Sequence, residues 1–81
     1  MSSAESARER LGRRVRKLRA GVGLTQEELA VWLDTDVSYV GLLETGRVAP
    51  SIGMLQTLGE VFGLSLDELL RGIRFPRRAR S

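Results

Sequence analysis

The stretch Leu24–Pro50, LTQEELAVWLDTDVSYVGLLETGRVAP, decides the fold expected for this chain of 81 residues. Thr25 and Glu28 have the spacing of a capping box, in which each side chain bonds the backbone amide of the other residue. A helix is therefore expected to begin at Gln26. Apolar positions then recur at helical spacing and fall on one face of that helix: Leu29, Ala30 and Leu33.

A second helix is expected after residues 34–36, because their Asp-Thr-Asp sequence favours turns and helix N-caps. This helix directs Val40 and Leu43 inward and stops at Gly46, a residue type that commonly follows helix ends. The small side chain of Ala30 lets two helices joined by so short a corner approach each other closely. The layout is that of a helix-turn-helix, whose second helix usually enters the major groove of DNA.

Two further helices are expected at the ends of the domain. The first begins near Ser3 or Ser6, where two capping boxes fit, and ends in the Gly-Val-Gly segment 21–23. The last begins after Ser65, which also starts a capping box, and ends near residues 71–72.

The remaining helix follows Ser51, its expected N-cap, and ends at Gly63. Its core-facing positions are expected to be Ile52, Leu55, Leu58, Val61 and Phe62. No segment alternates with period two, so we expect an all-α fold of five helices. Residues 1–72 are expected to form the folded domain and residues 73–81 a basic, flexible tail.

The composition limits the chemistry that the chain can perform. The chain has no cysteine and no histidine, which removes disulfides, thiolate or imidazole metal ligands and the usual general base. We therefore expect no enzymatic activity, no metal site and no cofactor. No apolar run reaches membrane-spanning length and the N-terminus lacks a signal-peptide core, so the sequence predicts a cytoplasmic protein without membrane contact.

The net charge of +3 conceals a segregation of charge along the chain. Residues 1–24 carry seven cations and two carboxylates, residues 25–72 carry two cations and eight carboxylates, and residues 73–81 carry four arginines. If DNA phosphates are attracted, that attraction is expected from the first helix and the tail. The alternative is that the arginines are simply solvated side chains on an exposed helix face and bind no phosphate.

Several short motifs are spread over LGRRVRKLRAGVGLTQEELA (11–30) and VSYVGLLETGRVAPSIGMLQTLGEVFGLSLDELL (37–70). They are the Leu-Thr-Gln entry to the helix at Gln26, Ala30, the Tyr39-Val40 pair, Leu43-Glu44 with Gly46, and Pro50-Ser51. With them the chain resembles the lambda-repressor-like, Cro-type (XRE) family of helix-turn-helix regulators. The resemblance implies a compact five-helix DNA-binding domain. In length, the chain resembles the short members of the family, which include repressors, restriction–modification controllers and antitoxins.

The resemblance also implies roles for three polar residues other than the base-reading positions. Family members commonly place the glutamine at the position of Gln26 against a DNA phosphate, where the helix N-terminus adds free amides. A merely solvated glutamine is the alternative. Arg19 and Glu44 match positions that often form an ion pair, which would hold the recognition helix against the first helix.

The positions that read bases in the family are occupied here by short or apolar residues. The resemblance places at the DNA Asp36 at the helix start, Val37, Ser38, Gly41 and Leu42 along the helix, and Tyr39 and Thr45 at the edges. Arg, Lys, Asn and Gln, the usual bidentate readers of guanine and adenine, are absent from this surface. We therefore expect sparse direct readout, with Val37 able to touch a thymine methyl and DNA shape contributing more. Arg47 and the backbone amides at Ser51 are expected to contact phosphates.

The last expected helix and the segment after it carry more apolar side chains than one short helix can bury. Leu70, Ile73 and Phe75 are therefore expected to form a dimer interface. The predicted function is a homodimeric transcriptional regulator that binds double-stranded DNA at a palindromic operator, with RNA polymerase as a possible protein partner. The alternative is a helix-turn-helix used as a protein-interaction module or antitoxin-like subunit with weak DNA binding.

Overall fold

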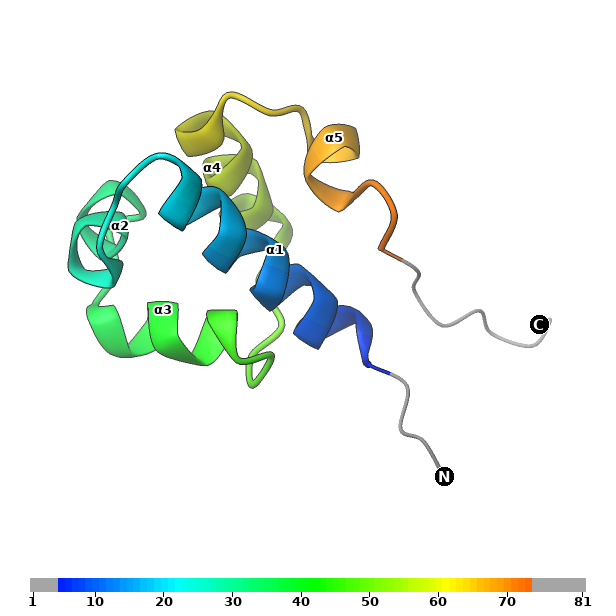
Figure 1. Cartoon of the computed structure of the whole chain (residues 1–81), viewed down its shortest axis with the longest axis horizontal. Helices are drawn as coiled ribbons and strands as arrows, with labels where there is room; N and C mark the ends of the chain where they lie inside the picture. The colour runs from blue at the N-terminus through cyan, green and yellow to red at the C-terminus, as the bar shows by residue number, and fades with distance from the viewer. Residues whose placement is uncertain (1–4, 74–81) are drawn as a thin grey trace, which may run out of the picture.

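Five helices make up the fold of the computed structural model, which describes residues 5–73 (Figure 1). In chain order they are α1 (Ala7–Gly21), α2 (Gln26–Trp32), α3 (Val37–Glu44), α4 (Ile52–Phe62) and α5 (Leu66–Leu70). Each helix begins after a serine, threonine or aspartate whose side chain accepts a hydrogen bond from a backbone amide of the first turn: Ser6, Thr25, Asp36, Ser51 and Ser65. The predicted all-α fold is confirmed for the described residues.

The hydrophobic core takes one fully buried side chain from every helix. These residues are Val15, Leu29, Val40, Leu58 and Leu69, each with no exposed surface. Burial of a leucine or valine side chain stabilises a fold by about 1.5–3 kcal/mol, so these five positions tie the short helices into one unit. The inward stripe expected for α2 is also buried.

The corner between α2 and α3 is closed by local hydrogen bonds. The amide of Thr35 donates to the carbonyl oxygen of Ala30 at 2.9 Å, and Asp34 adopts the left-handed conformation with φ of 57°. Ala30 is buried beside this corner. The corner therefore has the short, close-packed geometry that the sequence predicts.

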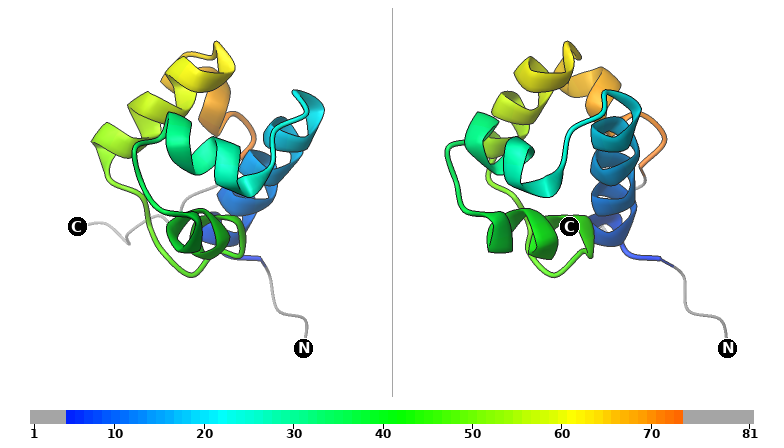
Figure 2. Two further views of the ribbon diagram at one scale, coloured as in Figure 1. Left: turned by 90° about the vertical axis from the view of Figure 1, so that its left-hand side faces the viewer. Right: turned by 60° about the vertical axis from the view of Figure 1, so that its left-hand side comes forward.

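α3 lies along one edge of the molecule, with α4 and α5 on the opposite side (Figures 1 and 2). It packs against α1 and α2 and leaves its outer side uncovered by the described residues. The approach to α1 is closest at Gly12, where an added Cβ would fall against the carbonyl oxygen of Leu43 and 2.7 Å from that of Glu44. A side chain at this position would push α3 away from α1.

One core prediction is wrong. Ile52 is 66% exposed, whereas Leu58 in the same helix is fully buried. Six residues separate them, which turns the Ile52 side chain about 120° away from the buried direction in an α-helix. The apolar character of Ile52 therefore does not reflect core packing.

In residues 5–73, no helix is both long enough and apolar enough to cross a lipid bilayer.

Candidate nucleic-acid interface

The outer side of α3 presents five short, uncharged residues, which we call the α3 face: Val37, Ser38, Gly41, Leu42 and Thr45. Val37 and Leu42 are 40% and 39% exposed, and an ideal Cβ built on Gly41 meets no atom within 4 Å. The structure thus gathers on one surface the four central residues that the resemblance assigns to base reading. Thr45, which follows the last helical residue, belongs to the same surface.

Both hydroxyl groups of the α3 face donate within the protein. The Ser38 hydroxyl donates to Oδ1 of Asp36 at 2.6 Å, and the Thr45 hydroxyl donates to the carbonyl oxygen of Gly41 at 2.8 Å. The hydrogen bonds from Ser38 and from the amide of Tyr39 lower the pKa of Asp36, which is therefore ionised at neutral pH. Each hydroxyl oxygen can still accept a hydrogen bond, but its proton is donated within the protein.

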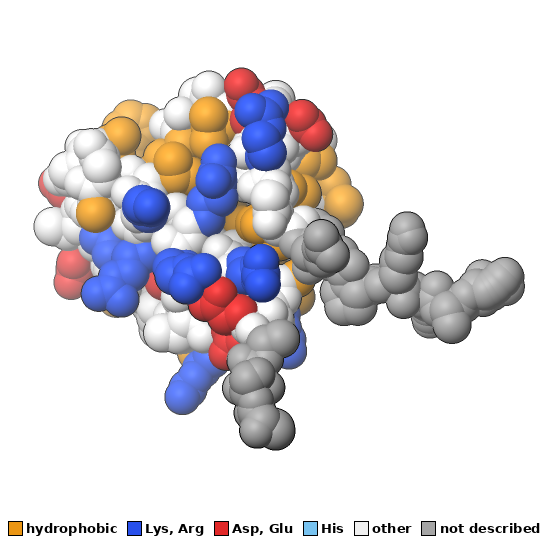
Figure 3. All heavy atoms as spheres, turned by 45° about the vertical axis from the view of Figure 1, so that its right-hand side comes forward, with side chains coloured by type: hydrophobic (Ala, Val, Ile, Leu, Met, Phe, Trp, Pro, Cys, Tyr) orange, Lys and Arg blue, Asp and Glu red, His pale blue; other side chains and the backbone are white. Residues whose placement is uncertain are grey.

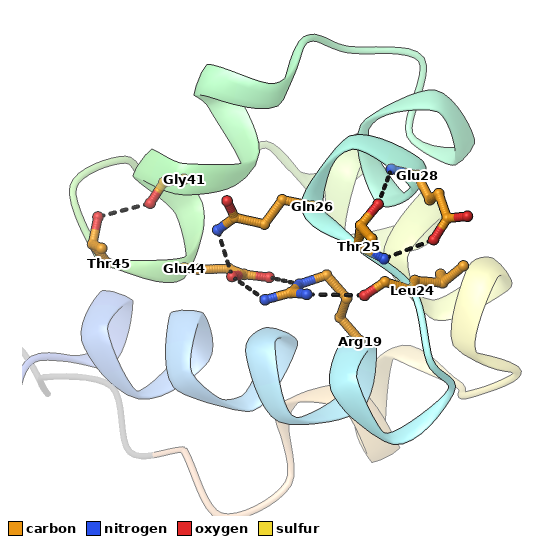
Figure 4. A network of polar contacts seen from close by, with 8 residues as sticks. All are labelled: Arg19, Leu24, Thr25, Gln26, Glu28, Gly41, Glu44 and Thr45. Carbon is orange, nitrogen blue, oxygen red and sulfur yellow. Dashed lines mark hydrogen bonds and ion pairs between the residues drawn. The ribbon is translucent and has the colours of Figure 1, made fainter.

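A partly buried polar network joins Glu44, at the end of α3, to α1 and α2 (Figure 4). Arg19 Nε donates to Glu44 Oε2 at 2.6 Å, and Arg19 Nη2 donates to Glu44 Oε1 at 3.0 Å. Arg19 also donates through Nη1 to the carbonyl oxygen of Leu24 at 2.9 Å. The pair that the resemblance implies is therefore present, and it is bidentate.

The environment of this pair gives it a positioning role. The Glu44 side chain is only 2% exposed and that of Arg19 14%, so each charge depends on the other for solvation. The hydrogen bond to Glu44 raises the pKa of Arg19 further above its ordinary value. The network fixes the end of α3 relative to the start of α2 and the end of α1.

Gln26 takes part in the same network. Its Nε2 donates to Glu44 Oε1 at 3.0 Å, a contact that the sequence analysis did not anticipate. A primary amide has two N–H donors, so this bond uses one of them and the other is available to a phosphate. The phosphate contact of Gln26 stays a prediction.

Tyr39, Arg47 and Ser51 lie around the α3 face in different environments. Tyr39 is partly buried against the core, and this burial raises the pKa of its phenol, which stays protonated. Arg47 is exposed, and within residues 5–73 it has no ion-pair partner. Ser51 is exposed and caps α4 by accepting from the amide of Met54 at 3.0 Å. Their expected contacts with DNA stay predictions.

The cations of α1 line two hollows, and Arg13 and Arg16 border both of them. At the end of α3, these two arginines share a hollow with Glu5, Glu9, Glu44 and Thr45. Arg14 points the other way and donates through Nη2 to the carbonyl oxygen of Glu68 at 2.9 Å. Arg16 is thus a neighbour of the α3 face that sequence reasoning missed, although its spacing from Arg13 places both on one side of a helix.

On that other side, α1 and the segment after α5 enclose a groove rich in positive charge, which we call the basic groove. It is lined by Arg10, Arg13, Arg14, Arg16, Lys17, Ala20 and residues 71–73. Figure 3 shows Lys and Arg side chains gathered in a band across this side of the molecule. The domain therefore has a second surface, which is positively charged, whereas the α3 face is uncharged.

The residues expected at a dimer interface are only partly accessible. Leu70 and Ile73 are half-buried against the core of their own domain, and Ile73 also borders the basic groove. Phe75, like most of the expected tail, lies outside the described residues. In residues 5–73 no group of three acidic, His or Cys side chains is arranged to hold a metal ion.

The fold and the α2–α3 pair define a helix-turn-helix domain of the kind found in transcriptional regulators. Residues 10–72 match the family described as a helix-turn-helix domain, and the chain belongs to that family. The family prediction made from the sequence is thereby confirmed.

Among relatives, the chain is 36% identical over 66 residues to the HTH-type transcriptional regulator DdrOP3 of Deinococcus deserti. This match covers 82% of the chain and 51% of the relative, so the chain spans about half the length of that protein. It is 41% identical over 58 residues to the uncharacterized HTH-type transcriptional regulator YazB of Bacillus subtilis, covering 72% of the chain and 84% of the relative.

Two solved structures have the same fold. The clp gene regulator ClgR of Corynebacterium glutamicum superposes with a TM-score of 0.81 at 31% identity, covering 86% of this chain and 90% of that one. The restriction-modification controller protein C.AhdI of Aeromonas hydrophila superposes with a TM-score of 0.70 at 36% identity, covering 75% and 88%. These neighbours are regulators, and the similarity extends over most of the described fold.

Proposed function

We propose that this chain binds specific DNA sequences through α3 and regulates transcription as a homodimer on a palindromic operator. The observation that carries the proposal is the exposure of α3 along one edge of the molecule. No described residue covers its outer side. An α-helix with side chains is about 10–12 Å across, which matches a major groove about 12 Å wide.

The residues around α3 fit the contacts that such docking requires. With α3 in the groove, the start of α2 at Gln26 faces one strand of the backbone and Arg47 the other. Phosphate contacts fix register, whereas the α3 face touches base edges. In a two-fold complex the half-sites lie about 34 Å apart, so that two copies of α3 enter successive major grooves.

A salt titration with random duplex DNA tests the binding itself. We expect the logarithm of the affinity to fall linearly with the logarithm of salt concentration between about 50 and 200 mM. Sites selected from a random duplex pool should be palindromic and should bind two copies of the chain, as measured by sedimentation. One copy per selected duplex would contradict the homodimer, and absence of binding at low salt would contradict the whole proposal.

A second candidate function is that of a protein-interaction module. It is favoured by Val31 and Trp32 on α2, which are 79% and 64% exposed although both are apolar. Isolated exposed apolar residues are normal, but a neighbouring pair on one short helix suits a protein contact. Under this alternative, Trp32→Ala would abolish partner binding and the chain would show no affinity for duplex DNA at any salt concentration.

A further inference from the structure

Toward DNA, the α3 face presents aliphatic methyl groups and hydrogen-bond acceptors. Its side-chain hydrogen-bond donors already donate within the protein. The hydroxyl protons of Ser38 and Thr45 are committed to Asp36 and to the carbonyl oxygen of Gly41, at 2.6 and 2.8 Å. Gly41 has no side chain, and Val37 and Leu42 are aliphatic. The Tyr39 phenol belongs to a ring that is partly buried against the core, at the border of this face.

The bases differ in the groups that they present to such a surface in the major groove. Guanine presents only acceptors there, N7 and O6, and requires donors that the α3 face does not supply. Thymine is the one standard base that presents an apolar group, its C5-methyl, and this group can pack on aliphatic side chains. The chemistry of the face therefore favours thymine over guanine.

The geometry of α3 suits contacts with such methyl groups. Val37 and Leu42 stand at the two margins of the face, about 7.5 Å apart along the helix axis at 1.5 Å per residue. Gly41 lies between them, and the open space at its Cα lets the helix backbone come close to the groove floor. Both aliphatic side chains are about two-fifths exposed, so each has surface left to bury against a base.

We propose that α3 recognises its operator by the C5-methyl groups of pyrimidines, with Val37 and Leu42 as the methyl-contacting residues. This inference rests on the proposed DNA binding and specifies the chemistry of its readout. The methyl group belongs to thymine in unmodified DNA, and 5-methylcytosine presents the same group at the same place.

Replacement of thymine by deoxyuridine in a selected operator tests the inference, because it removes the methyl group and leaves base pairing intact. Loss of one buried methyl should weaken binding about threefold to fivefold at each contacted thymine. An operator in which a contacted T·A pair is replaced by C·G should bind weakly. Use of 5-methylcytosine in place of that cytosine should restore part of the affinity. Restoration by 5-methylcytosine identifies the methyl as the recognised group, and its failure would contradict the extension of the inference from thymine to 5-methylcytosine.

Variants of the protein assign the contacts to residues. In Leu42→Ala or Val37→Ala, deoxyuridine at the contacted position should no longer weaken binding, because the methyl has lost its partner. Ile52→Ala removes an exposed aliphatic side chain outside α3, 66% exposed against about 40% for Val37 and Leu42, and should keep the full deoxyuridine effect. Thermal unfolding of each variant checks that the fold is retained.

Three outcomes would overturn the inference, and they are distinguishable from one another. If the chain selects an operator but no deoxyuridine substitution weakens binding, methyl recognition is wrong and the proposed function stands. If the deoxyuridine effect persists in both alanine variants, the assignment to Val37 and Leu42 is wrong. If no duplex is selected from the pool, the proposed function fails and this inference fails with it.

Discussion

The α3 face is uncharged, whereas the basic groove along α1 is rich in positive charge. α3 contains one charged residue, Glu44, and that residue is buried, whereas α1 contains six arginines and one lysine. Charge attracts any nucleic acid regardless of sequence, and short apolar side chains act only at contact distance. If the chain binds DNA as proposed, this contrast suits charge-based attraction and contact-based discrimination at different surfaces of the domain.

Two features hold these surfaces in a fixed relation. The Arg19–Glu44–Gln26 network joins the end of α3 to α1 and α2, and Gly12 permits the close contact between α1 and α3. Loss of either feature is expected to shift α3 relative to α1. The predictions below test this relation, beginning with the largest expected effect.

Glu44→Ala should lower the free energy of unfolding by about 3–5 kcal/mol, because it leaves the largely buried Arg19 without its carboxylate. Urea denaturation measures the change. Arg13→Ala is the matched control, since it removes an ion pair to Glu5 whose arginine is 68% exposed and should cost less than about 1 kcal/mol. Equal losses in the two variants would show that burial does not distinguish these pairs.

Gly12→Ala should destabilise the domain by about 1–3 kcal/mol, since the added methyl group overlaps carbonyl oxygens at the end of α3. Gly41→Ala is the control within α3, where the methyl meets nothing. There the higher helix propensity of alanine should stabilise the domain by up to about 1 kcal/mol. Thermal unfolding of both variants checks the opposite signs, and a stable Gly12→Ala variant would contradict the close approach of α1 and α3.

Arg47→Ala should reduce affinity for all duplexes similarly and flatten the salt dependence by about one unit of slope, because one phosphate contact is lost. Lys17→Ala removes a cation that lines the basic groove, away from Thr45, and should leave the slope unchanged. Fluorescence anisotropy with random duplex DNA provides both slopes. An equal change in the two variants would mean that the attraction is not concentrated at Arg47 but shared with the cations of the basic groove.

Ser38→Ala should raise the pKa of Asp36 toward its ordinary value, since the Ser38 hydroxyl is the main group that lowers it. Asp36 has a lower pKa in the folded state than in the unfolded chain. Its capping contribution is therefore fully present above the unfolded-state pKa of about 3.9 and is lost as pH falls through the folded-state value. NMR titration of the Asp36 carboxylate measures the shift, and an unchanged pKa in Ser38→Ala would exclude the hydroxyl as its cause.

Features that depend on a few consecutive residues were predictable from the sequence. The capping boxes at Thr25 and Ser65 and the N-caps at Asp36 and Ser51 each involve residues three apart or fewer, and all start helices where expected. The outward position of Ile52 was missed because apolar spacing alone does not say which of these positions faces the core; once Leu58 is known to be buried, helical spacing turns Ile52 away from it.

Contacts between distant residues were predictable only where a resemblance supplied them. Arg19 and Glu44 are 25 residues apart, and their pairing came from the family pattern. The bond from Gln26 to Glu44 and the role of Gly12 were missed, since both depend on how three helices meet. A glycine inside a strongly helical segment was the available signal for Gly12, because it costs about 1 kcal/mol relative to alanine unless close packing requires it.

The open space at Gly41 has a consequence for the evolution of such regulators. An arginine, asparagine or glutamine at this position would project from α3 without displacing any other part of the domain. If α3 enters the major groove as proposed, one substitution would add a bidentate base contact to a helix whose outer side carries no such side chain. Duplicated copies of this chain could diverge toward new target genes by that single change while every core position stays as it is.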